Sequence, residues 1–161
     1  MIKINNCRIV VLAAVAASFF APGMRAADSE QPGSLYRRLG GMPAIQAVVD
    51  DFVTRILADE RVNRWFAHAA ADPENARAYK TKLADLICQG TGGPCKYTGA
   101  DMFAAHKGRG ITEDAFNAVV SDLVATLDNL KVPEKEKGQL LGLLAPMKPA
   151  IVQDKQESAR Q

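Results

Sequence analysis

The sequence has few of the residues that common metal and nucleotide sites require. Its 161 residues contain two histidines, His68 and His106, which are too far apart for a His-Glu-x-x-His zinc motif. No Cys-x-x-Cys-His segment is present for covalent haem attachment. The stretches 90–94 and 108–110 are rich in glycine, but neither follows a strand pattern, and the first lacks the Lys-Ser/Thr pair of a phosphate loop. These absences disfavour zinc hydrolases, c-type cytochromes and P-loop proteins.

The first 26 residues differ in character from the rest of the chain. Lys3 and Arg8 flank the start of an apolar run at 9–21, and small residues follow near Arg25. The run is well short of the roughly 20 apolar residues that span a bilayer. We therefore predict that 1–26 is a secretory signal peptide and that the protein is exported, in a bacterium to the periplasm. An uncleaved membrane anchor is the alternative.

Removal of 1–26 changes the charge and the cysteine count. The segment has three basic residues and no acidic ones, so 17 basic and 18 acidic residues remain, a net charge of −1. Without a polybasic stretch, neither nucleic acid nor an anionic membrane surface is an expected partner. No segment after the signal is apolar enough to stop transfer, so stable membrane insertion is not expected either. Cys7 is lost as well, which leaves Cys88 and Cys95 on either side of a glycine-rich turn. Export favours a disulfide between them, but two unconnected buried thiols fit the spacing equally well.

The apolar residues recur with a helical period from Leu35 onward, and no segment alternates as a half-buried strand would. We predict one all-α domain at 35–152, between a polar leader at 27–34 and a polar tail at 153–161. Short helical pieces are expected at 60–68 and 101–107. The four long amphipathic helices are expected from 43 to about 57, from 72 to about 89, from 112 to about 129, and from 133 to 151 with a kink at Pro146.

His106 lies in an unusual setting on the short predicted helix between two glycine breaks. Met102 precedes it by four residues, and Ala104 and Ala105 lie beside it. Small neighbours leave room for a flat group against the imidazole. Taken alone, however, such a histidine is more often a surface or capping residue than a cofactor ligand.

Several motifs together resemble the truncated haemoglobins of group 1 over about residues 35–152. The resemblance implies a truncated globin fold, a two-over-two helical sandwich around non-covalent haem b, which binds oxygen and also nitric oxide or carbon monoxide. It implies that His106 is the proximal iron ligand, whose second ring nitrogen we expect to bond the Met102 carbonyl. The motifs are Leu35–Gly41, Asp51-Phe52, Trp65-Phe66, Gly92–Pro94, Tyr97–Gly99, Met102, Ala105-His106, Gly108–Ile111, Phe116 and Ala145-Pro146.

The same resemblance assigns residues to the haem pocket, where an apolar disc needs apolar walls and its propionates need cations or hydroxyls. Lys80, Tyr97 and Arg109 are the residues expected near the propionates. For each apolar residue, plain core packing is the alternative. The predicted wall residues are Phe52, Phe66, Leu83, Leu86, Ile87, Met102, Ile111, Phe116, Val119 and Leu144.

The chain departs from the resemblance on the distal side of the haem. Many group 1 members have a tyrosine where this chain has Val53, and that tyrosine donates a hydrogen bond to bound oxygen. We predict that Tyr79 replaces it, with a purely packing role for Tyr79 as the alternative. Lys82 is a weaker candidate for a sixth iron ligand, and His68 is expected to face solvent.

Three roles remain open for such a globin: oxygen carriage, gas sensing, and conversion of nitric oxide to nitrate. Conversion of nitric oxide to nitrate would make the protein an enzyme; we leave enzyme activity open and do not favour it. No electron donor for that reaction can be identified from the sequence. A haem-free helical interaction module is the competing class of function. Because the domain is small, we expect the haem to complete its core and the haem-free protein to be less stable.

Overall fold

The computed structural model describes residues 33–153 and contains only helices and connecting segments in that range. This confirms the all-α prediction. The predicted signal peptide, nearly all of the leader, and the tail beyond Gln153 lie outside the described residues. The elements are α1 (Leu35–Leu39), α2 (Gly41–Ala58), η1 (Asn63–Phe66), α3 (Ala67–Ala70), α4 (Pro73–Gly90), α5 (Met102–His106), α6 (Glu113–Asn129), α7 (Glu134–Gly142), η2 (Ala145–Met147) and α8 (Lys148–Ile151).

Side-chain caps fix where the helices of interest begin. The Asp72 carboxylate accepts a hydrogen bond from the Asn75 amide at 2.8 Å and starts α4. The Thr112 hydroxyl accepts one from the Ala115 amide at 3.1 Å and starts α6. Each cap satisfies one of the amides that a helix leaves without a partner in its first turn. Both caps were predicted from the sequence.

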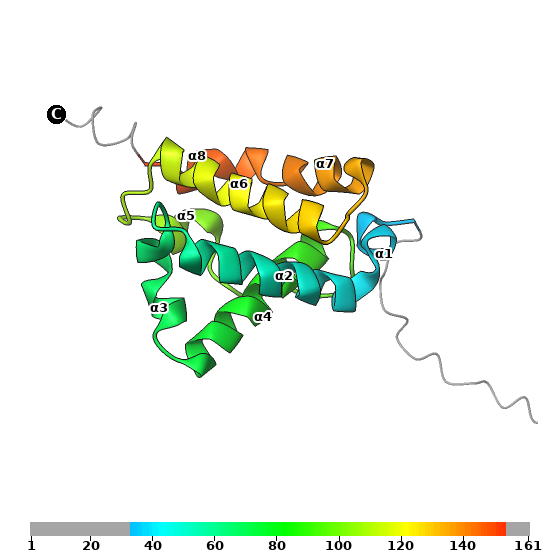
Figure 1. Cartoon of the computed structure of the whole chain (residues 1–161), viewed down its shortest axis with the longest axis horizontal. Coiled ribbons are helices and arrows are strands. Elements are labelled where there is room, and N and C mark those ends of the chain that lie inside the picture. The colour runs from blue at the N-terminus through cyan, green and yellow to red at the C-terminus, as the bar shows by residue number, and fades with distance from the viewer. Residues whose placement is uncertain (1–32, 154–161) are drawn as a thin grey trace, which may run out of the picture.

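α2 packs against α4 on one side and against α6 on the other (Figure 1). Its buried residues divide into two rows with a spacing of four. Ile45, Val49 and Val53 join the cluster formed with α1 and α4. The other row, 48, 52 and 56, joins the cluster formed with α6 and α7. α2 is therefore the shared wall of two apolar layers, which explains why its predicted apolar stripe is so wide.

The C-terminal region differs from the predicted single kinked helix. α7 ends at Gly142, a 3-10 turn follows at 145–147, and α8 is a separate helix of one turn. Pro146 and Pro149 lack the amide that an α-helix needs, and each disfavours helical backbone in the residue before it. Two prolines three residues apart therefore break the helix, where the prediction allowed only a kink at Pro146.

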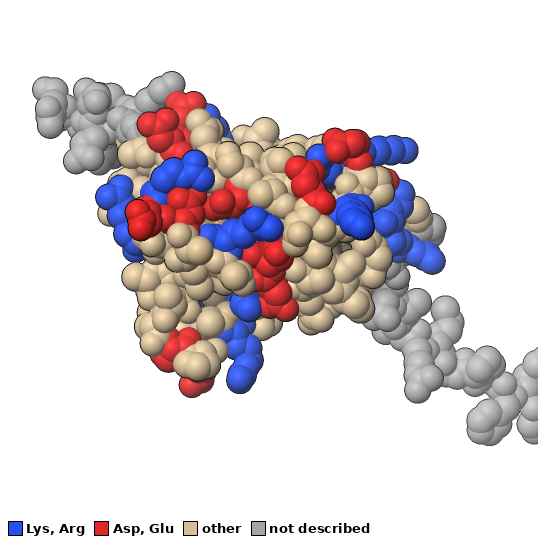
Figure 2. Space-filling model, viewed as in Figure 1, with Lys and Arg blue, Asp and Glu red and all other residues tan. Residues whose placement is uncertain are grey.

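The surface carries charges of both signs. Acidic and basic side chains are interspersed on the face shown in Figure 2. Arg55 and Asp51 form an ion pair on α2 at 2.6 Å, and Arg38 on α1 pairs with Glu136 on α7 at 3.0 Å. Between residues 33 and 153, no helix is both long and apolar enough to cross a membrane.

Candidate functional site

His106 is the last residue of α5, a helix of only five residues. The carboxylate of Asp101 fixes the start of this helix by accepting a hydrogen bond from the Ala104 amide at 3.0 Å. The His106 side chain is half-buried, and its Nδ1 lies 2.7 Å from the Met102 carbonyl oxygen. That carbonyl can only accept, so Nδ1 carries a proton, and in the neutral imidazole Nε2 is the nitrogen with the free lone pair. The predicted bond to Met102 is confirmed.

One face of α4 presents Tyr79, Leu83, Leu86 and Ile87, all of them half-buried. Their spacing of four, seven and eight residues places them on one stripe of the helix. The ring of Phe66 meets that of Tyr79 edge to face, with centroids 5.9 Å apart. An apolar face with an aromatic hydroxyl at one end is therefore built from α4 and the 3-10 turn η1.

The Tyr79 hydroxyl lies in a low-polarity setting. Its pKa is raised to about 12, mainly by burial and also by nearby Tyr97, while Arg109 acts in the opposite direction. No residue between 33 and 153 forms a hydrogen bond with this hydroxyl. Tyr97 and Arg109 lie in the connections that follow α4 and α5, and both are close enough to Tyr79 to act on it electrostatically. At neutral pH the phenol is a hydrogen-bond donor.

Most of the predicted wall residues come together in one apolar cluster. Phe52 and Ile111 belong to its buried part, at 7% and 9% exposure. The members that pack against them are only partly buried, so their apolar surface is incompletely covered: Phe66, Tyr79, Leu83, Ile87, Val119 and Leu144. Leu86, Met102 and Phe116 are also half-buried, but they lie outside this cluster.

The predicted polar residues take different positions. Tyr97 is half-buried and donates a hydrogen bond from its hydroxyl to the Ala100 carbonyl at 2.9 Å. Arg109 is exposed, close enough to affect the pKa of Tyr79. The Lys80 ammonium pairs with Asp50 on α2 at 2.8 Å, so a propionate would have to compete with that carboxylate. Lys82 is exposed, as is His68.

A disulfide joins Cys88, at the end of α4, to Cys95 in the loop that leads to α5. The structure therefore decides between the two possibilities that the spacing left open. Gly93 lies inside this small ring, and a side chain there would come within 2.6 Å of both the Cys88 sulfur and the Tyr36 ring. Only glycine fits, which explains the glycine-rich sequence of the turn.

Two residues that contact the region around His106 were not among the predicted site residues. The Trp65 indole nitrogen donates a hydrogen bond to the Arg109 carbonyl at 2.9 Å. The Gln153 side-chain nitrogen donates one to the His106 carbonyl at 2.9 Å. The sequence places Gln153 at the start of the polar tail, and a single glutamine there carries no pattern from which the contact could be predicted.

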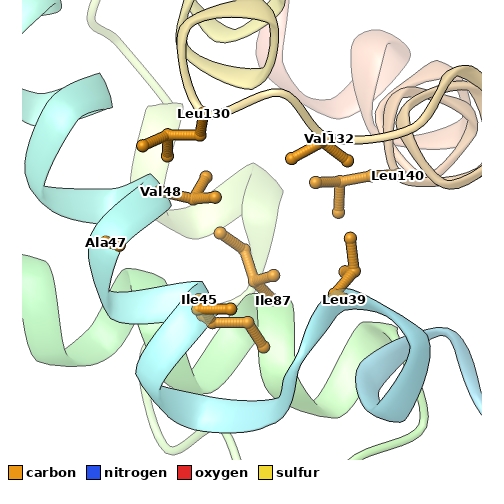
Figure 3. A pocket seen from close by; sticks show the side chains of 9 residues that line it. Leu39, Ile45, Ala47, Val48, Ile87, Leu130, Val132 and Leu140 are labelled. Atoms are coloured by element: carbon orange, nitrogen blue, oxygen red, sulfur yellow. The ribbon is translucent and has the colours of Figure 1, made fainter.

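An apolar cavity of about 190 Å³ lies between α1, α2, α4 and the α6–α7 corner. Leu39, Val48, Ile87 and Leu140 point into it (Figure 3). A second, more polar cavity of about 520 Å³ lies between α2 and α4 and includes the Lys80–Asp50 pair. Neither is lined by a residue of α5. Ile87 belongs to both the first cavity and the apolar face of α4.

The arrangement fits a haem group in three respects. The Met102 carbonyl holds one ring nitrogen of His106 and leaves the other for a metal. Partly covered aliphatic and aromatic side chains supply the surface that an apolar disc would bury. The exposed Arg109 guanidinium acts on Tyr79 electrostatically and suits a carboxylate at the edge of such a group, whereas the Tyr97 hydroxyl would first have to give up its bond to the Ala100 carbonyl.

The comparisons with known proteins agree with this chemistry. The family model of the bacterial-like globins matches residues 34–153. A group 1 truncated hemoglobin of Mycolicibacterium paratuberculosis is 37% identical over 121 residues, which are 75% of this chain and 85% of that protein.

Two solved structures are similar in fold as well as in sequence. The Fe(III) form of the truncated hemoglobin of Tetrahymena pyriformis has a TM-score of 0.66 and 28% identity, over 74% of this chain and 97% of that one. The 2/2 hemoglobin of Synechococcus, in the cyanomet state with covalently attached haem, has a TM-score of 0.66 and 30% identity, over 74% and 98%. The fold is the two-over-two globin sandwich, and this chain belongs to the bacterial-like globins as a haem-binding truncated haemoglobin of group 1.

Proposed function

We propose that this protein is an exported haem b globin that binds oxygen or another diatomic gas reversibly. In this proposal His106 is the proximal iron ligand and Tyr79 donates a hydrogen bond to the gas. Haem supplies the open coordination position that a gas can occupy. The observation that carries the proposal is the 2.7 Å contact between His106 Nδ1 and the Met102 carbonyl.

That contact prepares His106 for metal binding in two ways. It fixes the tautomer, because a carbonyl accepts the Nδ1 proton and leaves Nε2 unprotonated. It also holds the ring orientation, because donor and acceptor lie on the same turn of α5. A metal ligand held by such a partner needs little reorganisation on binding, and the donated hydrogen bond raises its basicity.

Tyr79 has the properties that a distal donor needs. Its hydroxyl remains protonated because burial raises its pKa to about 12. Its ring is held by the edge-to-face contact with Phe66. No hydrogen bond within residues 33–153 would have to break before it could donate to a gas molecule. Lys82, with its exposed side chain, is the less favoured residue for this side of the haem.

The cavity of Figure 3 suits the same ligands. Its lining is aliphatic, and it includes Ile87, which also belongs to the apolar face of α4. An aliphatic lining offers water no hydrogen-bond partner and suits small apolar molecules. A weakly hydrated gas would therefore enter it at little cost.

The disulfide supports the export part of the proposal. Disulfides persist in the periplasm and outside the cell, whereas the cytosol keeps thiols reduced. The Cys88–Cys95 bond therefore suits a chain whose first 26 residues read as a secretory signal. Fractionation of cells that express the full chain should recover the processed protein outside the cytosol, with both thiols blocked to alkylation.

Gas binding is tested directly by spectroscopy of the purified protein. We expect a Soret band in the haem-loaded chain and a new, reversible visible spectrum when the reduced protein is exposed to oxygen. Removal of oxygen should restore the starting spectrum. Immediate oxidation without a reversible spectrum would contradict the proposal.

A further inference from the structure

The segment that follows His106 has little helical support of its own. Two of its glycines have positive φ angles, 75° at Gly108 and 61° at Gly110, and α6 begins only at Glu113. α5 has only five residues, and His106 is at its C-terminal end. Inside the segment, the Lys107 amide donates to the Phe103 carbonyl at 2.8 Å and the Arg109 amide donates to the His106 carbonyl at 3.1 Å. Contacts from outside the segment add to this short local support.

Gln153 contacts the segment at three points. Its side-chain nitrogen donates to the His106 carbonyl at 2.9 Å, and its side-chain oxygen accepts from the Gly110 amide at 3.3 Å. Its backbone amide donates to the Ile111 carbonyl at 3.0 Å. One residue, 47 positions from His106 along the chain, thus connects the histidine to the start of the next element.

Gln153 is itself held in place by its surroundings. It follows α8, which packs against α5. Lys148 on α8 forms an ion pair with Glu113 on α6 at 2.6 Å. Trp65 bonds the same segment through the Arg109 carbonyl at 2.9 Å. The segment after His106 is therefore bonded by residues from two different parts of the chain.

We propose that Gln153 is a positioning residue for the proximal histidine, which is an inference that rests on the proposed function. Asp101 fixes the start of α5, and Gln153 fixes its end through the backbone of His106. With both ends fixed, the imidazole keeps one tilt toward the haem. Loss of the Gln153 contact would let the end of α5 move and would weaken the average bond between His106 and the iron.

The test compares Gln153→Glu and Gln153→Ala in the full, haem-loaded chain. Glutamate has the same shape but places an acceptor oxygen against the His106 carbonyl, and alanine removes both side-chain contacts. We expect both variants to release haem to apomyoglobin about three to ten times faster than the parent, as expected for the loss of one or two hydrogen bonds. Gln46→Glu makes the same chemical change on the exposed surface of α2 and is the matched control.

The iron–histidine stretching band in the resonance Raman spectrum of the ferrous protein reports on positioning. A merely structural residue would leave it unchanged. In both Gln153 variants we expect this band to broaden and move to lower frequency. An unchanged band and an unchanged haem release rate would overturn the inference.

Hydrogen exchange of the haem-free protein separates this inference from the proposed function. We expect faster exchange of the Gly110 amide in Gln153→Ala, whether or not His106 binds iron. If His106→Ala retains haem as the parent does, the proposed function fails while this exchange result can still hold. If His106→Ala loses haem and the Gln153 variants match the parent in exchange, release and band position, only the positioning role fails.

Discussion

Tyr79 is the residue proposed to replace the distal tyrosine that many group 1 members have at the position of Val53. Its ring is held by Phe66, and its hydroxyl has a pKa raised to about 12 by burial. Val53, which replaces the usual distal tyrosine, is fully buried and packs in the cluster with α1 and α4. In the proposed function the hydrogen-bond donor therefore lies on α4, whereas the family resemblance places it at the position of Val53 on α2.

Tyr79→Phe tests whether the hydroxyl holds the gas. A hydrogen bond to a polarised group contributes about 1.5 to 3 kcal/mol, so we expect oxygen release to become roughly 10 to 150 times faster. Stopped-flow measurement of oxygen release checks this. Carbon monoxide is the control ligand, because its bound form is less polar and its release should change less. An equal oxygen release rate in parent and variant would assign Tyr79 to packing alone.

The pKa of Tyr79 adds a pH test of the same role. The phenol stays protonated in the folded protein until the pH approaches about 12. Oxygen release by the parent should therefore be independent of Tyr79 titration between about pH 6 and pH 10. A break in the release rate within that range that disappears in Tyr79→Phe would contradict this account.

Single residues differ in how far their roles could be predicted. The bond between His106 and Met102 follows from a spacing of four on a helix and was expected. The ion pair between Lys80 and Asp50 was not expected, because Asp50 lies on a different helix, α2. Gln153 could not be assigned at all, since its contacts depend on how α8 returns to α5.

At the scale of elements, the junction of α2 and α6 carries an acidic pair. Burial is the main cause that raises the pKa of Asp122 above its ordinary value of 3.8; the Asp59 carboxylate raises it further, and Arg61 opposes both. One oxygen of Asp122 is buried without a hydrogen-bond partner among the described residues. The ionised form of Asp122 is therefore disfavoured in the folded state.

Asp122→Asn should raise the free energy of unfolding at pH 7 by about 1 kcal/mol, because the amide can donate to Asp59 and carries no charge. A raised pKa means that the contribution of Asp122 to stability is fully present below 3.8 and is lost as pH rises through the folded-state pKa. The difference between variant and parent should therefore shrink when thermal unfolding is repeated below about pH 3. A variant less stable than the parent at pH 7 would contradict the assignment.

The Cys88–Cys95 bond fixes the connection between α4 and α5. Closure of so small a ring should stabilise the protein by about 2 kcal/mol through loss of chain entropy in the unfolded state. We expect a thiol reductant to lower the melting temperature of the parent to that of Cys95→Ser. Cys95→Ser should itself be insensitive to the reductant. A parent that melts at the same temperature in both conditions would show that the bond contributes nothing.

Element boundaries were predictable where local chemistry sets them. Asp72 and Thr112 cap α4 and α6 as the sequence indicates, and glycines end α4 near the expected position. The break between α7 and α8 was missed, because the apolar spacing continues through Pro146 even though the backbone cannot. Periodicity records which residues are buried, not whether the helix between them is continuous.

At the scale of the whole molecule, the central apolar cluster leaves part of its surface uncovered. Phe66, Leu83, Val119 and Leu144 are only partly buried although they pack against the central cluster. Haem would cover surface of this kind from both sides of a flat ring. The small size of the domain suggested this arrangement, and the family to which the chain belongs binds haem.

The haem-free protein should therefore unfold more easily than the haem-loaded protein. A ligand that binds only the folded state adds about 4 kcal/mol when its concentration is a thousand times its dissociation constant. Urea unfolding with and without one equivalent of hemin, followed by far-ultraviolet circular dichroism, measures the difference. Equal midpoints in the two titrations would mean that the core is complete without haem.

The central claim is that His106 binds the haem iron, and the most direct test is the haem content of His106→Ala. His68→Ala is the matched control, because His68 is the other histidine of the chain and its side chain is exposed. After identical reconstitution with hemin and gel filtration, we expect His106→Ala to lose most of its Soret absorbance and His68→Ala to retain the absorbance of the parent. Parental haem content and spectrum in His106→Ala would contradict the account.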